Sequence, residues 1–424
     1  MGIQGNRCLG EPSDALPPEG GKMTTSRFID EGQQAFMNTW IVDLTGRSVP
    51  YDRHLVGALG DAGGSVDFWV RADVDLLHGE TVRSPLLRVG DRISLQQRRL
   101  RKVVKAAEHV VNLGHLLVAC ARERPDVVHF QWMPLLEIAP VIAHGVVRLI
   151  QNMGIPVVYT VHNVLPHDTG VRHREAFQRV YEIADLLICH TVGARKTLVD
   201  TFGIAPSSVR VLPHGPLGAS AWSGTTSEAR RALSIPDRIP LVGLFGGLRP
   251  YKGIPFLLDA WAQVHRIRPD ARLVLAGSGS AEYEAELRAQ IRNAGLEHAV
   301  ECRFYYLPDE ELDQLVQACD VLVYPYRAIT QSGALMKGMQ SNAAIVSTDV
   351  GGLGEILQHG KTALLVEYGN VEGLAKQLLA ALQDPERRNE LASAAQHEVR
   401  TKLSWASIAA DTIDAYRAAS SVDA

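Results

Sequence analysis

The sequence predicts an α/β fold made of two consecutive, doubly wound parallel-sheet domains of the Rossmann-like type. From about residue 39 onward, short runs rich in β-branched residues alternate with helix-length segments, which is typical of βαβ units. The alternation starts again near residue 241, after a stretch rich in Ser, Gly and Thr that indicates a linker. A length of 424 residues suits two or three domains better than one.

The individual elements follow from these runs. The expected strands are residues 39–44, 65–70, 127–131, 156–161, 186–190 and 209–212, then 241–245, 271–276, 300–304, 321–324, 344–347 and 363–366. Helices are expected between them, for example at 254–266 and 281–294.

Domain boundaries follow from the same pattern. We expect a disordered N-terminal extension at 1–36, a first domain at 37–217, a linker at 218–228, a second domain at 229–402 and a C-terminal helix at 403–424. The last helix carries an apolar stripe that includes Trp405, Ile408 and Tyr416, so it should pack against a domain. It either caps its own domain or crosses back to the first.

Composition excludes several classes of protein. The 43 basic residues are offset by 47 acidic ones, and this net charge of −4 carries no nucleic-acid signature. The 5 cysteines form no C-x-x-C pair, so neither a disulfide framework nor a zinc site is indicated, and a reducing cytosol fits best. The N-terminus lacks the apolar core of a secretory signal, and no run of about 18 uncharged apolar residues suggests a membrane span.

The best candidate site begins at the loop GGLRPYKG, residues 246–253, between an apolar strand and a helix. Glycines such as Gly247 let a backbone approach a phosphate closely, and the N-terminus of a helix offers free N–H groups. Arg249 and Lys252 would supply positive charge. The loop therefore predicts an anion site, and the alternative is a tight turn with solvated cations.

A second loop predicts the same chemistry. After the strand at 321–324, the chain passes through Thr330, Gln331, Ser332 and Gly333 into an apolar helix. A hydroxyl of Thr330 or Ser332 can cap this helix, and a capping hydroxyl beside free N–H groups can also hold a diphosphate. Helix capping alone is the alternative.

A histidine and an amide follow a strand in the first domain. The run TVHN, residues 160–163, places His162 and Asn163 just past a strand end, where parallel sheets bind ligands. A core histidine satisfied by the backbone is the default interpretation, but a position facing the second domain favours contact with a substrate. His129 lies inside a strand and is expected to be structural.

Other chemistries lack their motifs. Residues 277–281, GSGSA, follow a strand, but Glu282 stands where a dinucleotide fingerprint needs its third glycine, which disfavours an oxidoreductase. The sequence contains no P-loop, no H-E-x-x-H or paired-aspartate metal site and no G-x-S-x-G elbow. We therefore expect no bound metal.

These motifs, in this order and spacing, resemble the GT-B glycosyltransferases of family 4, the group 1 glycosyltransferases. The resemblance covers nearly everything from Trp40 onward, and it rests on YDRHL (51–55), TVHN (160–163), PHG (213–215), RPYKG (249–253), SG (332–333) and TDVGG (348–352). It implies two Rossmann-like domains facing across a cleft, with the acceptor bound mainly by the first and the donor by the second. Members transfer a sugar from a nucleotide diphosphate sugar, a co-substrate, with retention of configuration and usually without a metal or other cofactor.

The resemblance also implies residue roles. Lys252 and Arg249 would neutralise the departing diphosphate. Ser332 and Gly333 would donate hydrogen bonds to it, and His162 would contact the donor sugar.

The chain departs from the family pattern in two places. Gly247 stands where the family commonly has an arginine, and Ile329 and Lys337 stand where it has two glutamates spaced E-x7-E. The second glutamate normally holds the nucleotide ribose. Lys337 is therefore expected close to the nucleotide, where its cation pairs with phosphate or points to solvent.

We predict a cytoplasmic, retaining, metal-independent glycosyltransferase that acts on a saccharide, lipid-linked or small-molecule acceptor, with no nucleic-acid partner. Loss of both family glutamates motivates a rival hypothesis, a catalytically silent GT-B scaffold or partner subunit. An oxidoreductase would instead bind nicotinamide.

A basic helix adds one further hypothesis. The helix expected around 97–113 places Arg98, Arg101, Lys102 and Lys105 on one face and Leu100, Val104, Ala107 and Val111 on the other. An ordinary solvated face is one interpretation. The other is reversible contact with anionic lipid headgroups at the inner membrane face, or with an acidic acceptor.

Overall fold

Two fully parallel sheets organise the described part of the chain, which confirms the predicted α/β class and the two Rossmann-like domains. The computed structural model describes residues 37–70, 81–88, 98–165, 170–218 and 222–420. The expected extension at 1–36 lies outside these ranges. The described residues belong to one compact unit.

The first sheet has 7 strands in the order β3-β2-β1-β4-β5-β6-β7. Its strands are β1 (Asn38–Asp43), β2 (Ser65–Val70), β3 (Thr81–Arg83), β4 (Val127–Phe130), β5 (Val157–Val161), β6 (Leu186–Cys189) and β7 (Val209–Val211). Its helices are α1 (Val49–Asp61), α2 (Arg98–Glu123), α3 (Pro140–Gln151), α4 (Arg174–Ile183) and α5 (Val192–Phe202), with 3₁₀ turns at Gly170–His173 and Pro206–Ser208. Strand order reverses between β1 and β4, so residues that follow these strands converge at one edge of the sheet.

The second sheet has 6 strands in the order β10-β9-β8-β11-β12-β13. They are β8 (Leu241–Phe245), β9 (Arg272–Ala276), β10 (Val300–Arg303), β11 (Val321–Tyr324), β12 (Ala344–Thr348) and β13 (Leu364–Val366). The helices are α6 (Thr226–Ala232), α7 (Ile254–Ile267), α8 (Ala281–Asn293), α9 (Asp309–Ala318), α10 (Gly333–Met339), α11 (Gly351–Ile356), α12 (Val371–Gln383) and α13 (Pro385–Thr401), with a 3₁₀ turn at Pro250–Lys252. The switch point lies between β8 and β11, which directly precede the two predicted anion loops.

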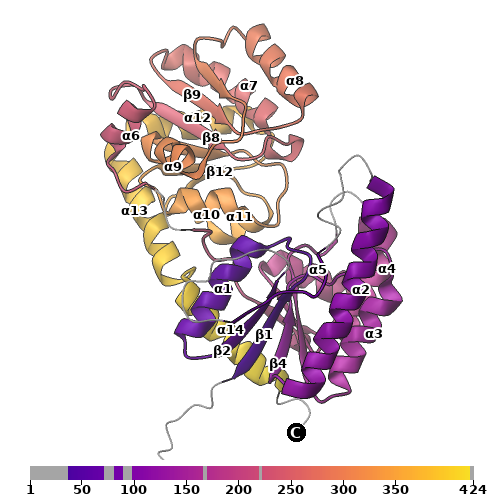
Figure 1. The fold of residues 1–424 in the computed structure, drawn as a ribbon. Helices are drawn as coiled ribbons and strands as arrows, with labels where there is room; N and C mark the ends of the chain where they lie inside the picture. Colours follow the sequence, from indigo (N-terminus) through magenta and orange to yellow (C-terminus); the bar gives the residue numbers. More distant parts are fainter. Residues whose placement is uncertain (1–36, 71–80, 89–97, 166–169, 219–221, 421–424) are drawn as a thin grey trace, which may run out of the picture. The chain divides into compact units, whose positions relative to one another are not determined.

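The last helix, α14 (Trp405–Ser420), packs on α1 of the first domain (Figure 1). Ile408 and Tyr416 share a buried apolar cluster with Tyr51 and Leu55 of α1. Trp405 Nε1 also donates a hydrogen bond to the Pro216 carbonyl oxygen at 2.8 Å. The C-terminal helix therefore belongs to the core of the first domain.

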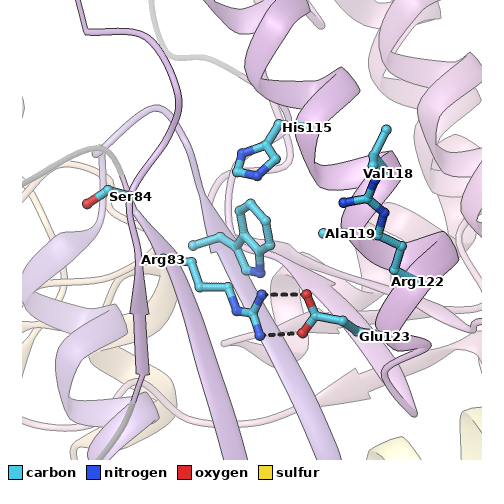
Figure 2. Close-up of a pocket in the computed structure, with 8 residues that line it drawn as sticks. Arg83, Ser84, His115, Val118, Ala119, Arg122 and Glu123 are labelled. Carbon is cyan, nitrogen blue, oxygen red and sulfur yellow. Dashed lines mark hydrogen bonds and ion pairs between the residues drawn. The ribbon is translucent and has the colours of Figure 1, made fainter.

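Edge strand β3, which sequence patterning missed, is held by Arg83. Its guanidinium donates to both carboxylate oxygens of Glu123 on α2, at 2.8 and 2.5 Å (Figure 2), and lies 5.5 Å from the Trp69 ring. Ser84, His115 and Arg122 line the cavity of about 270 Å³ beside this pair. None of the site residues predicted from the sequence lines this cavity.

Helix α2 turns a different face inward from the one its sequence suggested. Downstream of the basic cluster, its buried positions are Glu108, Asn112, Leu113, Leu116, Ala119 and Cys120, which share a helical face with Arg101 and Lys105. Of the face expected to be apolar, Leu100 is 52% exposed, Val111 is 42% exposed and Ala107 is exposed, whereas Val104 is half-buried. Val103 at 68%, Val110 at 44% and Val118 at 49% extend this exposed apolar stripe. The Arg98 side chain lies outside the described residues. The predicted inward face was wrong because the sequence of α2 allows either face to pack inward. Tertiary packing selects between them.

One helix among the described residues is long and apolar enough to cross a membrane by length and composition. It is the segment Leu100–Glu123 of α2, whose most apolar window is 33% buried. The sequence criterion of an uncharged run overlooked it, because scattered charges interrupt the segment while its mean hydropathy stays at 1.3. This length and composition do not by themselves distinguish a membrane helix from the core helix of a soluble protein.

Candidate active site

Lys252 is a buried cation at the carboxyl end of β8. The 3₁₀ turn Pro250–Lys252 places its Nζ 3.1 Å from the Phe245 carbonyl oxygen, to which it donates, and 5.4 Å from the centre of the Tyr326 ring. Only 5% of Lys252 is exposed. This burial, together with the charge of Arg249, lowers the pKa of Lys252 to about 8. An ammonium has three N–H donors, so one carbonyl contact leaves capacity to bind an anion.

Two glycines of residues 246–253, called the lysine loop below, stand where a Cβ would meet close neighbours. Gly246 has φ +96°, and a Cβ there would lie 2.9 Å from Lys252 Nζ and 4.0 Å from the Cβ of Ala334 in α10. Gly253 has φ +66°, and its Cβ would lie 1.9 Å from the Pro325 carbonyl oxygen. Both positions need glycine. The contacts also show that the lysine loop lies against the end of β11 and the start of α10.

Arg249 and Gly247 belong to the same loop and are exposed, as are Pro250 and Tyr251. Arg249 Nη1 donates to the Leu248 carbonyl oxygen at 3.2 Å. Its charge acts on Lys252, whose pKa it helps to lower. The two cations therefore lie near each other, an arrangement that a bound anion would relieve.

The second predicted loop combines a helix cap with a buried donor. Ser332 Oγ accepts a hydrogen bond from the Leu335 N–H at 3.1 Å, so it is the N-cap of α10. Gln331 Nε2 is buried and has no hydrogen-bond partner among the described residues. Gly333 packs closely, because a Cβ there would lie 3.2 Å from Leu217 Cδ1. A buried N–H without a partner is costly, so Gln331 offers a donor to a ligand.

A cavity of about 310 Å³ brings residues of both domains together. The first domain contributes Asn163, and the second contributes Ile329, Thr330 and Glu355. The Glu355 carboxylate accepts hydrogen bonds from the N–H groups of Val192 and Gly193 at 2.5 and 2.7 Å, at the N-terminus of α5. A carboxylate stabilises this end of a helix. The predicted residues Asn163 and Thr330 thus line one cavity.

His162 lies in an aromatic cluster at the end of β5. Its ring stacks on Trp132 at 5.2 Å and meets the Tyr51 ring edge-on at 5.2 Å. Its Nε2 is 3.1 Å from Gln131 Oε1. Burial, and then the neighbouring imidazoles, hold the pKa of His162 well below its usual value. His162 is therefore a neutral hydrogen-bonding group at pH 7.

Sequence reasoning missed several neighbours of His162. Gln131 and Trp132 follow β4, and His190 follows β6 and lies 5.2 Å from the His162 ring. His190 Nδ1 donates to the Leu212 carbonyl oxygen at 2.9 Å, whereas its buried Nε2 meets no partner in the described ranges. His214 follows β7, and its ring lies 5.6 Å from that of His190. The signal that could have found them is that each lies within three residues of the carboxyl end of a parallel strand.

Lys337 points into the second domain's own core. Its ammonium pairs with the carboxylate of Asp313 on α9, a residue that is 2% exposed. Ile329, at the place of the other family glutamate, accepts a hydrogen bond from the Gly352 N–H at 3.1 Å through its backbone. These two positions therefore hold α10 and the loop before it, Lys337 through an ion pair and Ile329 through a backbone contact. The nucleotide contact of Lys337 stays a prediction.

The donors at this site are ammonium, guanidinium, amide and imidazole groups, which suit a phosphorylated ligand. Within the ranges that the structure describes, no group of three His, Cys, Asp or Glu side chains is placed to hold a metal ion.

Comparison with known proteins gives matches over both domains. The family described as "Glycosyltransferase Family 4" matches residues 51–215, and that described as "Glycosyl transferases group 1" matches residues 239–384. A D-inositol 3-phosphate glycosyltransferase of Pseudarthrobacter chlorophenolicus is 26% identical over 398 residues, covering 89% of this chain and 91% of that protein. The corresponding enzyme of Corynebacterium aurimucosum is 28% identical over 286 residues, covering 63% of this chain and 68% of that protein.

Solved structures show the same fold. HepE of Anabaena, solved with UDP and glucose, matches with a TM-score of 0.66 at 20% identity, covering 89% of this chain and 98% of HepE. Sucrose-phosphate synthase of Thermosynechococcus elongatus matches with a TM-score of 0.68 at 20% identity, covering 89% and 98%. With both of its domains matched by this family, the chain belongs to the group 1 glycosyltransferases of family 4, which have the GT-B fold.

Proposed function

We propose that this glycosyltransferase binds a uridine diphosphate sugar with its diphosphate between the lysine loop and residues 330–333, and transfers the sugar with retention. The observation that carries the proposal is Lys252, a buried ammonium whose lowered pKa indicates that its charge lacks compensation. The unpartnered amide nitrogen of Gln331 lies in the adjacent loop. The Anabaena protein of the same fold, solved with UDP and glucose, supports a uridine nucleotide.

The chemistry follows from where charge develops. As the bond between the anomeric carbon and the diphosphate oxygen breaks, its electron pair stays on the diphosphate, which gains negative charge. Lys252 and Arg249 stabilise that charge, and Gln331 adds a neutral donor. The acceptor hydroxyl oxygen forms the new bond to the anomeric carbon and passes its proton to an oxygen of the departing diphosphate, which leaves as UDP. His162 and Asn163, after β5, orient the donor sugar.

A donor panel tests the proposal. UDP-, GDP-, ADP- and TDP-sugars are added to the protein with saccharide, polyol phosphate and lipid-linked acceptors, and thermal stability and free nucleoside diphosphate are recorded. We expect UDP-sugars to give the largest stabilisation and to release UDP, since a ligand that binds the folded state raises its stability by mass action. A donor that stabilises the protein but releases no diphosphate with any acceptor would favour the silent scaffold, which the replaced glutamates at Ile329 and Lys337 motivate.

We also propose that the exposed apolar face of α2 and α3 contacts a lipid surface. Helix α3, which packs beside α2, exposes Val141 at 82%, Ile142 at 40% and Leu149 at 49%, in addition to the stripe on α2. Exposed apolar patches of this kind mark interaction surfaces. The exposed cation Lys102 flanks the stripe. Burial of these apolar side chains in the lipid, rather than attraction between the predicted basic face and lipid headgroups, would then provide most of the binding free energy.

Vesicle sedimentation separates this proposal from the alternatives. We expect the wild-type protein to sediment with lipid vesicles and Val103→Glu/Val110→Glu to stay in solution. Ile267→Glu, at a residue of α7 that is 58% exposed, is the matched control and should behave as wild type. Loss of a dimer in the double variant, with no vesicle binding by the wild type, would show that the face joins two copies of the chain.

A further inference from the structure

A line of buried hydrogen bonds runs from α14 to the histidine of the candidate site. Tyr416 Oη is 2.6 Å from His129 Nδ1, and His129 Nε2 is 2.6 Å from Thr160 Oγ1 and 3.3 Å from Gln131 Nε2. Gln131 Oε1 is in turn 3.1 Å from His162 Nε2. Tyr416 and Gln131 are 0% exposed and His129 is 1% exposed. This line, Tyr416–His129–Gln131–His162, is called the relay below.

Each imidazole in the relay carries a single N–H. Burial lowers the pKa of His129 to about 3, and His162 is also held neutral by burial. A neutral imidazole has one donor nitrogen and one acceptor nitrogen. The hydrogen bonds around each ring therefore decide which nitrogen carries the proton.

The Gln131 amide couples the two rings. An amide nitrogen can only donate and an amide oxygen can only accept. Because Gln131 Nε2 faces His129 Nε2, that nitrogen is an acceptor, and the His129 proton lies on Nδ1, where it is donated to Tyr416 Oη. Because Gln131 Oε1 faces His162 Nε2, that nitrogen carries the His162 proton, and Nδ1 keeps the lone pair.

The relay has one other consistent arrangement. If the His129 proton lies on Nε2 instead, this N–H donates a hydrogen bond to Thr160 Oγ1. The Gln131 amide must then turn over, because two N–H groups cannot face each other. His162 Nε2 would then face an amide nitrogen, and its proton would move to Nδ1. In the first arrangement the His129 N–H needs the Tyr416 oxygen. In the second arrangement the His129 N–H does not need this oxygen, because it donates its hydrogen bond to Thr160 Oγ1.

We propose that Tyr416 is a positioning residue that sets the tautomer of His162 through His129 and Gln131. The lone pair on His162 Nδ1 is then free to accept a hydrogen bond from a hydroxyl of the donor sugar. This last step rests on the proposed function, in which His162 contacts that sugar. The C-terminal helix thus acts on the site through hydrogen bonds as well as through apolar packing.

Nitrogen NMR of the nucleotide-free protein tests the relay without any turnover. In ¹⁵N-histidine-labelled protein, the His162 signals are assigned by their loss in His162→Ala, and their shifts report which nitrogen is protonated. We expect the wild-type His162 to be protonated at Nε2 and Tyr416→Phe to shift it toward Nδ1. Thr412→Val is the matched control, because it removes a buried hydroxyl one turn earlier on α14 whose hydrogen-bond partner among the described residues is the Ile408 carbonyl oxygen. An unchanged His162 tautomer in a folded Tyr416→Phe protein would overturn the proposal.

Kinetics give a second readout. We expect Tyr416→Phe to lower kcat on the order of tenfold or more, with little change in the KM of the donor, because misplacing one contact of a reacting group has effects of this size. Thr412→Val should keep the wild-type kcat. In a Gln131→Met background the relay is already cut, so adding Tyr416→Phe should change kcat by less than about twofold. If Gln131→Met and Tyr416→Phe instead lower kcat by independent factors that multiply, Tyr416 only anchors α14. If the wild type turns over no donor at all, the proposed function fails, while the NMR result still decides the relay.

Discussion

Replacing Lys252 by methionine should have opposite effects on activity and on stability. Methionine matches the length of the side chain and removes its charge and its N–H donors. The ammonium it replaces is 5% exposed and has the Phe245 carbonyl oxygen at 3.1 Å as its protein partner. The substitution therefore removes a charge that the fold accommodates poorly and that a diphosphate needs.

The magnitudes follow from burial. The pKa of Lys252 falls from 10.5 to about 8, and at 1.36 kcal/mol per unit this corresponds to about 3 kcal/mol of unfavourable free energy for the charged form. Loss of the hydrogen bond to Phe245 offsets about 1 kcal/mol. We therefore expect Lys252→Met to raise the free energy of unfolding of the nucleotide-free protein by on the order of 2 kcal/mol. Loss of one oriented donor to the departing diphosphate should lower kcat/KM by on the order of a hundredfold or more.

Two assays on the same preparations decide the matter. Urea unfolding gives the free energy of unfolding, and a coupled assay of released UDP gives kcat/KM. Lys376→Met, at an exposed lysine of α12, is the matched control and should leave both values unchanged. Wild-type kcat/KM in Lys252→Met would remove this residue from the site. A lower free energy of unfolding would show that the buried ammonium stabilises the fold, contrary to the reasoning.

Three further predictions concern the same site. His162→Ala should lower kcat much more than it weakens UDP binding measured by calorimetry, and an effect on affinity alone would contradict contact with the sugar. Because the folded-state pKa of Lys252 is about 8 and the unfolded value is 10.5, the nucleotide-free protein should become more stable as pH rises through this window. UDP affinity should fall over the same rise, and a flat affinity profile from pH 7 to 10 would count against the lysine contact. Lys337→Glu should lower the free energy of unfolding by on the order of 3 kcal/mol, because it places a second carboxylate beside buried Asp313. Tighter donor binding in Lys337→Glu with unchanged stability would instead support the ribose contact of the family.

Most strands could be predicted because parallel strands buried on both faces are continuous apolar runs. Strands β2, β8 and β11 have the predicted bounds, β1 is shifted by one residue at both ends, and the other predicted strands differ by one residue at a single end. Edge strand β3 was missed, since Thr81–Arg83 is too short to show a pattern and is held by the bond between Arg83 and Glu123, 40 residues apart. Such pairings depend on tertiary contacts that spacing does not encode.

The candidate site was predictable to the extent that it lies in loops after strands. Lys252, Ser332 and His162 were found by this rule, because glycine loops and helix N-termini are local features. The partners of these residues were not predictable. The ion pair of Lys337 with Asp313 joins two helices, and the contact of His129 with Tyr416 joins residues 287 positions apart. His129 was expected to be structural, and only the fold shows its contacts with Tyr416 and Thr160.

A crystal structure of the protein with UDP tests the central claim most directly. The account predicts that diphosphate oxygens lie within hydrogen-bond distance of Lys252 Nζ and Gln331 Nε2, beside the N-terminus of α10. UDP bound elsewhere, for example in the cavity beside Arg83, with Lys252 still donating only to the Phe245 carbonyl oxygen, would contradict it.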